Sequence, residues 1–169
     1  MKPCAALALL AFTGCGYHLA GRGDLVPKSV KSIAIPAFGN GTPRYQLARL
    51  LSADIAREFI TRTRYKVLDD PAQADAVLHG ALVNFSNYPT IFDPTSGRAT
   101  GVQVIVIVRV DLVERATGKT IFSRPALEVR ERYTISTEPQ SYFDESGTAV
   151  IRVSKDVAHT VVTAILENF

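Results

Sequence analysis

Cysteine is scarce in this sequence. Its 169 residues include two cysteines, Cys4 and Cys15, and the first of them lies in an apolar N-terminal stretch. Such a stretch is typical of a leader that is removed on export, which would make Cys15 the only thiol of the mature chain. A single thiol excludes an intramolecular disulfide, so a hydrophobic core must hold the domain together. The composition, 47% hydrophobic and 21% charged, suits one globular domain with such a core.

A cluster of basic residues is also missing. The net charge is +3, and arginine and lysine are interleaved with acidic residues, so we expect no nucleic-acid partner. None of His18, His79 and His159 has a second ligand at metal spacing, so we expect no metal site and no cofactor. Ser154, Asp156 and His159 are close in sequence on one predicted helix, where their side chains do not converge into a catalytic triad. No catalytic residue is predicted, and the chain is not expected to be an enzyme.

The apolar N-terminal stretch is too short to cross a membrane as a helix. Lys2 precedes the apolar run Ala5–Phe12, and small residues stand before the cysteine in Thr13-Gly14-Cys15. This pattern is typical of bacterial lipoprotein signals, so we predict a signal peptide over residues 1–14 and a lipid on Cys15. Lipoprotein signals usually have leucine where Phe12 stands. The alternative is an ordinary signal peptide followed by an incidental cysteine.

The beginning of the mature chain is predicted to be a lipidated tether over residues 15–30. It is rich in glycine and has little hydrophobic periodicity. Several acyl chains on one cysteine give stable membrane attachment. Gly16 stands where an aspartate would resemble an inner-membrane retention signal, so we expect attachment to the periplasmic side of the outer membrane. The remainder, residues 31–169, is predicted to be a single domain.

The longest regular pattern of the sequence is the stretch Val102–Val113. Its even-numbered residues are all apolar, whereas its odd-numbered residues are mixed, and β-branched residues dominate. The pattern predicts a strand about 40 Å long whose even face is buried. The odd face, with Gln103, Ile105, Ile107 and Arg109, is too apolar for comfortable contact with water. We therefore predict that it binds a partner, the alternative being a second sheet layer above it.

The other predicted elements are shorter strands and two amphipathic helices. The strands are expected over residues 32–38, 65–68, 76–88, 120–122 and 127–135, and the helices over residues 43–61 and 142–167. These elements predict an α+β fold in which two helices pack on one face of a mainly antiparallel (mixed) four-stranded sheet, with the strand order left open. The connection 89–101 is longer than a hairpin needs, which predicts a functional or disordered loop.

A heptapeptide at the predicted cleavage site carries a family resemblance. The residues Cys15-Gly-Tyr-His-Leu-Ala-Gly21, and further on Val26-Pro27 with Ser32-Ile-Ala-Ile-Pro36, resemble the lipopolysaccharide-assembly lipoprotein family LptE. The similarity continues through the loop 89–101 to the C-terminal helix. It implies a lipoprotein that binds lipopolysaccharide. It also implies that the protein plugs and helps assemble the outer-membrane β-barrel translocon, an LptD-like protein, which inserts lipopolysaccharide into the outer leaflet.

The resemblance suggests where lipopolysaccharide would bind. Lipid A is a doubly phosphorylated, acylated disaccharide, so its site needs a cation beside apolar groups. Arg98 in the predicted loop stands near Ile91 and Phe92, and Arg130 and Arg132 on the following strand are the alternative cations. The competing interpretation is that Arg98 is a solvated loop residue.

A second group of lipoproteins is also similar to part of the sequence. The strand Ser32–Phe38, the helix after it and the segment Ala74–Gly80 resemble the α/β domain of TolB-like, curli-secretion and peptidoglycan-synthase-activator lipoproteins. Those domains are interaction modules with other partners. The opening heptapeptide and the long strand hairpin favour the LptE family.

Overall fold

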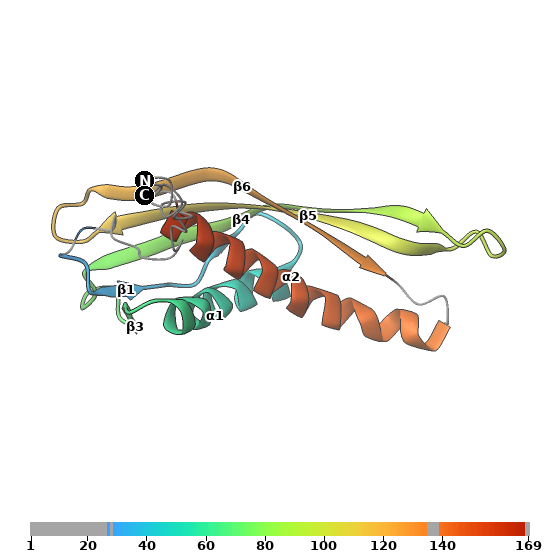
Figure 1. Ribbon diagram of the computed structural model, residues 1–169, viewed down its shortest axis with the longest axis horizontal. Helices are drawn as coiled ribbons and strands as arrows, with labels where there is room; N and C mark the ends of the chain where they lie inside the picture. The colour runs from blue at the N-terminus through green and yellow to red at the C-terminus, as the bar shows by residue number, and fades with distance from the viewer. Residues whose placement is uncertain (1–26, 28, 135–138, 168–169) are drawn as a thin grey trace, which may run out of the picture.

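The structure is a computed structural model that describes residues 27, 29–134 and 139–167, with only the backbone described over 139–148. Cys15, the signal peptide 1–14 and most of the tether 15–30 lie outside the described residues. The described residues form six strands and two helices, and Figure 1 shows their arrangement. In chain order these are β1 (Ser32–Ala34), β2 (Gly39–Asn40), α1 (Tyr45–Arg62), β3 (Lys66–Leu68), β4 (Ala76–Phe92), β5 (Ala99–Glu114), β6 (Thr120–Thr134) and α2 (Pro139–Glu167).

The strands form one mixed sheet in the order β3-β1-β4-β5-β6, with β2 pairing with β4 off this path. The three long strands are antiparallel neighbours, whereas β1, β2 and β3 take part in parallel pairs. The predicted α+β class, with two helices and a mixed sheet, is confirmed. The predicted count of four strands is wrong, because the sheet has six. The strands β2 and β3, of two and three residues, are too short for an alternating pattern to reveal their pairing.

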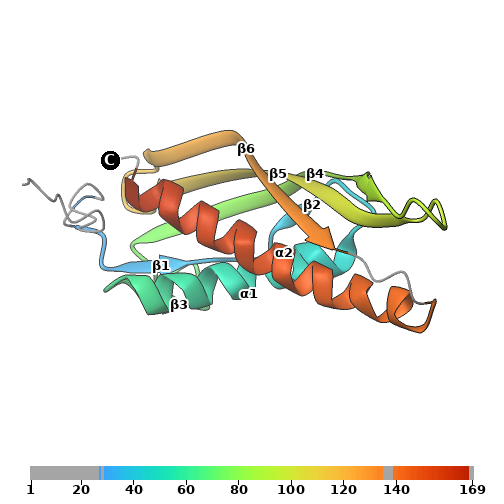
Figure 2. The same ribbon diagram turned by 45° about the vertical axis from the view of Figure 1, so that its right-hand side comes forward.

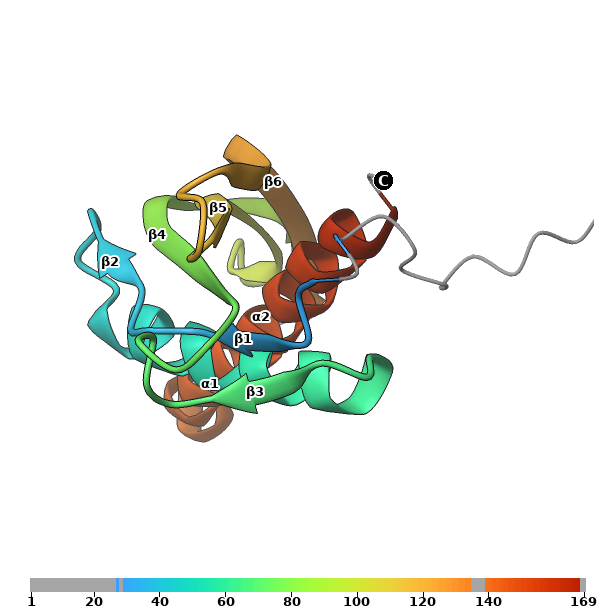
Figure 3. The ribbon, with the colours of Figure 1, turned by 90° about the vertical axis from the view of Figure 1, so that its left-hand side faces the viewer.

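The hydrophobic core lies between the even face of β5 and the two helices. The even-numbered residues from Val104 to Leu112 are all buried, and Figure 3 shows both helices on the same side of the long strands. The predicted apolar stripes of the helices pack into this core, because residues at helical spacing share one face. The buried stripe residues include Leu47, Leu51, Ile55 and Phe59 of α1, and Val153, Val157, Val161 and Ile165 of α2.

The β4–β5 hairpin extends much further than the sequence predicts. β4 continues to Phe92 and β5 begins at Ala99, so the predicted loop over 89–101 is wrong and only residues 93–98 connect the strands. Pro89 is paired with Val102, and Ile91 is paired with Gly101. Proline is tolerated because this part of β4 is a sheet edge. Gly101 is suited to its place because a Cβ there would lie 3.0 Å from the Ile91 side chain.

The connection 93–98 is a hydrogen-bonded turn organised by Asp93. Its carboxylate accepts hydrogen bonds from the N–H groups of Thr95 and Ser96, at 3.0 and 2.6 Å, and from the Ser96 hydroxyl. These bonds, that from the Ser96 N–H first, hold the pKa of Asp93 below its usual value. Gly97 adopts a positive φ of 66°, and the Asp93 N–H donates to the Arg98 carbonyl at 2.8 Å.

Strand β6 is continuous through Pro125, where the sequence predicts an interruption. A register shift lies between Val108 and Val110, opposite Pro125. Within the described residues β6 pairs only with β5, so it is an edge strand. Proline is tolerated at a bulge on an edge strand, because no sheet hydrogen bond is needed from its missing N–H there.

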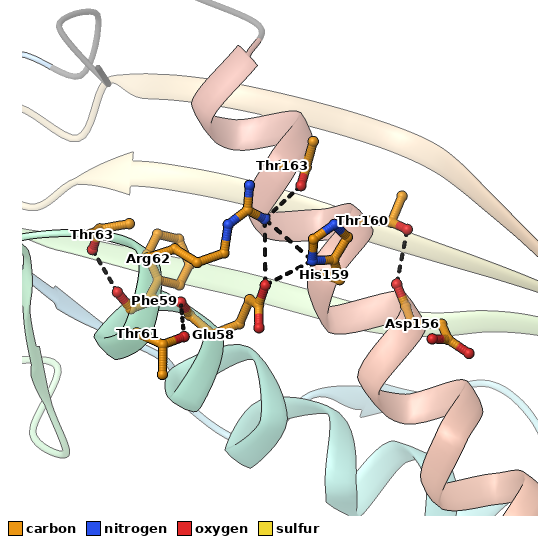
Figure 4. A network of polar contacts seen from close by, with 9 residues as sticks. All are labelled: Glu58, Phe59, Thr61, Arg62, Thr63, Asp156, His159, Thr160 and Thr163. Carbon is orange, nitrogen blue, oxygen red and sulfur yellow. Dashed lines mark hydrogen bonds and ion pairs between the residues drawn. The ribbon is translucent and has the colours of Figure 1, made fainter. Parts of the chain in front are cut away.

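A series of polar contacts joins the two helices along their line of packing. Residues at intervals of four on α1 each meet a residue of α2, so the helices run in the same direction (Figures 2 and 4). The innermost contact is buried, although a charged residue such as Asp54 is expected on the solvated side of an amphipathic helix. The contacts are Asp54 with Ser154 at 2.6 Å, Glu58 with the His159 Nδ1 at 2.8 Å, and Arg62 with Thr163 at 2.6 Å.

Gly80 offers a sharp test of the packing on β4. The Phe38 ring lies over it, and a Cβ at Gly80 would come within 2.2 Å of two ring atoms. Because Phe38 is only 7% exposed and has little room to move, Gly80→Ala should destabilise the domain by about 1–3 kcal/mol. The free energy of unfolding in urea measures this loss.

The matched control is Gly39→Ala, whose Cβ would meet no atom closer than 3.4 Å. It should leave the unfolding midpoint nearly unchanged. In a Phe38→Ala background, Gly80→Ala should cost little stability, because the ring that the new Cβ would contact is then absent. Equal stability of the two alanine variants would contradict the packing of Phe38 on Gly80.

Candidate partner-binding surface

The sheet face opposite the helices, here called the outer face, carries the odd-numbered residues of β5. Gln103, Ile105 and Ile107 are half-buried, and Arg109 is exposed. The described strands form a single sheet, and both helices lie on its other side (Figures 1 and 3). A second sheet layer, the alternative open from the sequence, is therefore absent from the described part of the chain.

Strand register determines the neighbours of these residues. Directly paired residues of antiparallel strands point to the same face of a sheet. The two isoleucines of the outer face are therefore flanked on both sides by polar side chains of β4 and β6. The rows across β4, β5 and β6 are Asn84, Ile107 and Glu128; Ser86, Ile105 and Arg130; and Tyr88, Gln103 and Arg132.

The charges of the outer face occur largely in pairs. Arg130 forms an ion pair with Glu128, which raises the pKa of the Arg130 guanidinium through a hydrogen bond and through the opposite charge. Arg109 lies 4.0 Å from Asp111, whose carboxylate also accepts a hydrogen bond from Ser123 at 2.7 Å. Exposed pairs of this kind contribute little to stability. They leave a face of low net charge with an apolar centre, which favours contact with another surface.

The tip of the β4–β5 hairpin is a second exposed region. Ile91 and Phe92 are 52% and 56% exposed, and Arg98 is exposed on the adjoining turn. The structure thus brings these three predicted lipopolysaccharide-binding residues to one end of the molecule. Phe92 pairs with Ala99, the residue after Arg98.

Arg130 and Arg132, the alternative cations, lie on the outer face, and Arg132 is the nearer of the two to the hairpin tip. Arg132 is in the row of Tyr88, and the next row contains Ile91 and Gly101. The contact that a Gly101 Cβ would make with Ile91 places the Ile91 side chain on the same face. The residues predicted as two separate sites are therefore parts of one continuous surface. Sequence analysis missed this continuity because periodicity gives the face of each strand and not the register between strands.

The N-terminal end of the domain lies at the opposite end of β5 from the hairpin tip. Ser29 donates a hydrogen bond to Glu114, the last residue of β5, at 2.9 Å. Asp75 accepts hydrogen bonds from the N–H groups of Lys31 and Ser32, each at 2.9 Å, and these lower its pKa. The 16 residues of β5 separate the two ends by about 50 Å at about 3.3 Å per residue.

Neither a metal site nor a membrane-spanning helix is found among the described residues. No group of three or more His, Cys, Asp or Glu side chains in that part of the chain could hold a metal ion. Neither described helix is both long and apolar enough to cross a membrane.

The fold is shared with bacterial proteins of known structure, one of them described as a lipoprotein. An uncharacterized lipoprotein B from Nitrosomonas europaea is 13% identical, with a TM-score of 0.54 over 81% of this chain and 83% of its own. The PelC dodecamer from Paraburkholderia phytofirmans is 16% identical, with a TM-score of 0.50 over 82% of this chain and 89% of its own. At these identities the likeness concerns the fold alone. No curated protein matches the sequence.

The family itself follows from the sequence of the whole domain. The family model LptE, described as lipopolysaccharide-assembly, matches residues 30–165. This range includes all the described strands and nearly all of α2, so the chain belongs to the LptE family. The family predicted from the opening heptapeptide is confirmed by residues that lie entirely outside that heptapeptide.

The contrast between the two faces of β5 can be tested with adjacent substitutions. Val106 is 1% exposed, so Val106→Asp would bury an unpaired carboxylate and cost about 4 kcal/mol or more. Ile105→Asp places the same group on the outer face beside Arg130, and should cost less than about 1 kcal/mol. Thermal unfolding of the purified domains measures both. Equal losses would mean that both faces of β5 belong to the core.

Proposed function

We propose that this chain is an outer-membrane lipoprotein, anchored at Cys15 on the periplasmic side, that plugs and helps assemble the β-barrel translocon for lipopolysaccharide. In this role its partners are the LptD-like barrel and lipopolysaccharide itself. The observation that carries the proposal is the match of the LptE family model to residues 30–165. The match covers the domain and not a short motif, and it favours this role over that of the TolB-like, curli-secretion and peptidoglycan-synthase-activator lipoproteins.

The outer face is the proposed contact with the barrel. Its centre, Ile105 and Ile107, is apolar and covered by no second layer among the described residues. Its rim is polar, and Arg130 and Glu128 compensate each other's charge. An apolar centre with a polar rim is the usual composition of a protein interface.

The hairpin tip is the proposed lipopolysaccharide contact. Arg98 supplies a cation for a lipid A phosphate, and the exposed Ile91 and Phe92 supply an apolar surface for acyl chains. Arg132 would extend this cationic surface along the outer face, since strand register puts it on the side toward which Ile91 points. Arg130 is the alternative cation only where the barrel does not cover its row.

Co-purification tests the proposed partner. The lipoprotein, extracted from outer membranes with detergent, should bring down the LptD-like barrel. Ile105→Asp should reduce the recovered barrel at least tenfold, because a carboxylate replaces an apolar contact at the centre of the interface. Ala116→Asp, on the exposed turn between β5 and β6 at the other end of the molecule, is the control and should not change recovery. Failure of the wild-type protein to bring down the barrel would contradict the proposed function.

A charge reversal at the tip tests lipopolysaccharide binding. Arg98→Glu replaces attraction by repulsion and should weaken binding by more than about tenfold, while the melting temperature barely changes. Titration of purified lipopolysaccharide into the domain measures the affinity. Arg49→Glu, an exposed reversal on α1, gives the same change in net charge and should bind like the wild type. If Arg98→Glu also binds like the wild type, the tip is not the binding site.

A further inference from the structure

Strand β4 has a long edge that no described strand covers. β2 pairs with β4 only at Ala81 and Leu82, where the Gly41 N–H donates to the Leu82 carbonyl at 2.9 Å. The chain then turns away toward α1, which begins at Tyr45. Beyond Leu82, within the part of the chain that the structure describes, β4 is paired with β5 alone.

The composition of this edge sets it apart from the opposite edge of the sheet. From Gly80 to Phe92 there is no Asp, Glu, Lys or Arg, and Val83 and Tyr88 are 48% and 52% exposed. Native proteins usually protect an open edge against strand addition with charges, proline or bulges. On β4, Pro89 and register shifts limit the open row to the residues between the shift after Leu82 and the shift after Pro89, and no charged residue protects that row. The β6 edge, in contrast, carries five charged residues, Arg124, Glu128, Arg130, Glu131 and Arg132.

The direction of the backbone groups along β4 follows from its pairing. The Leu82 carbonyl points away from β5, because it accepts from β2. The register shift between Leu82 and Asn84 inserts one residue, so the next residues whose groups point outward are Phe85 and Asn87. Pro89 agrees with this assignment, because a proline fits a strand where its missing N–H would point away from the neighbouring strand.

We propose that the edge Phe85–Pro89 of β4 receives one extended, uncharged strand of the barrel partner, paired through backbone hydrogen bonds. The chemistry of the edge requires an extended polypeptide, because only a strand presents N–H and C=O groups that alternate at the spacing of this row. An uncharged strand fits best, because residues 80–92 of β4 include no charged residue and the one cation described beside them, Arg44, lies over the Phe85 ring at 4.8 Å. The identity of the partner rests on the proposed function.

The open edge has only a few outward backbone groups between register shifts, which favours the barrel partner over a second copy of this chain. The outward groups are the N–H of Phe85 and Asn87 and the C=O of Phe85, Asn87 and Pro89, before the register shift that follows Pro89. So few backbone bonds do not offset the entropy lost when two separate molecules associate. They add affinity and register to a larger contact, and the outer face adjoins this edge through Tyr88 and Ser86.

A proline at Asn87 tests the inference directly. Asn87→Pro removes an outward N–H and leaves the pairing with β5 intact, so the domain should fold. In the co-purification with the barrel, recovery should fall at least fivefold. Asn87→Ala removes the same side chain but keeps the N–H, and should recover as much barrel as the wild type. A second measurement needs no variant: amide hydrogen exchange at Phe85 and Asn87 should slow at least tenfold in the complex.

The outcomes separate this inference from the proposed function. If the Asn87→Pro and Asn87→Ala proteins recover equal amounts of barrel, or the two amides exchange equally fast in the complex, the edge is not the site and the proposed function stands. If the wild-type protein recovers no barrel, the proposed function and the assigned partner both fail. A dimer of the isolated domain in sedimentation, abolished by Asn87→Pro but not by Asn87→Ala, would overturn the assignment in favour of a second copy.

Discussion

Burial of one face of β5 is the constraint on which the fold depends. Five successive even-numbered residues from Val104 to Leu112 must be kept from water, and no single helix is wide enough to cover them together with their neighbours on β4 and β6. Two helices therefore lie side by side on this face, and polar groups buried where they pack together must be paired. Ser154 of α2 donates a hydrogen bond to Asp54 of α1, and either group would be costly to leave unpaired. The position of α2 is thus fixed from two directions, by the sheet and by α1.

The sequence was sufficient wherever a pattern was long. A stretch of twelve residues with an apolar residue at every even position predicted the buried and outer faces of β5, and helical spacing predicted the stripes that contain Phe59 and Val157. The sequence was insufficient where a residue type is common in loops but also occurs in strands. Pro89 and Gly101 suggested a loop, yet both are in paired strands. Pro89 lies on an open edge, and Gly101 lies beneath the Ile91 side chain. Asp54 appeared to belong to the solvated side of α1 because its partner, Ser154, is 100 residues away. Long-range pairing of this kind has no local signal.

The candidate surface was predictable residue by residue but not as a whole. Alternation placed Ile105 and Ile107 on one face, and the family resemblance pointed to Arg98 with Ile91 and Phe92 as a cation beside apolar groups. The relation between these sets depends on the register of three strands, which includes several shifts. Register places Arg132 beside Gln103, and Gly101 turns Ile91 toward the same face. The two predicted sites are thereby joined into one surface that runs from the centre of the sheet to the hairpin tip.

This continuity restricts how the proposed functions can be combined. A barrel wall that covers Ile105 also covers Arg130 in the same row, so Arg130 cannot bind lipopolysaccharide while that contact is made. The tip is different, because Phe92 and Arg98 lie beyond the last row shared with β6, which pairs Gly101 with Thr134. The tip also lies about 50 Å from the end at which the tether enters the domain, by the length of β5. If Cys15 carries the proposed lipid, a tether of 15 or so residues could extend about as far again, so the anchor would not hold the tip at the membrane. In the proposed complex with the barrel, the hairpin tip would therefore be the part of this surface that stays accessible to lipopolysaccharide.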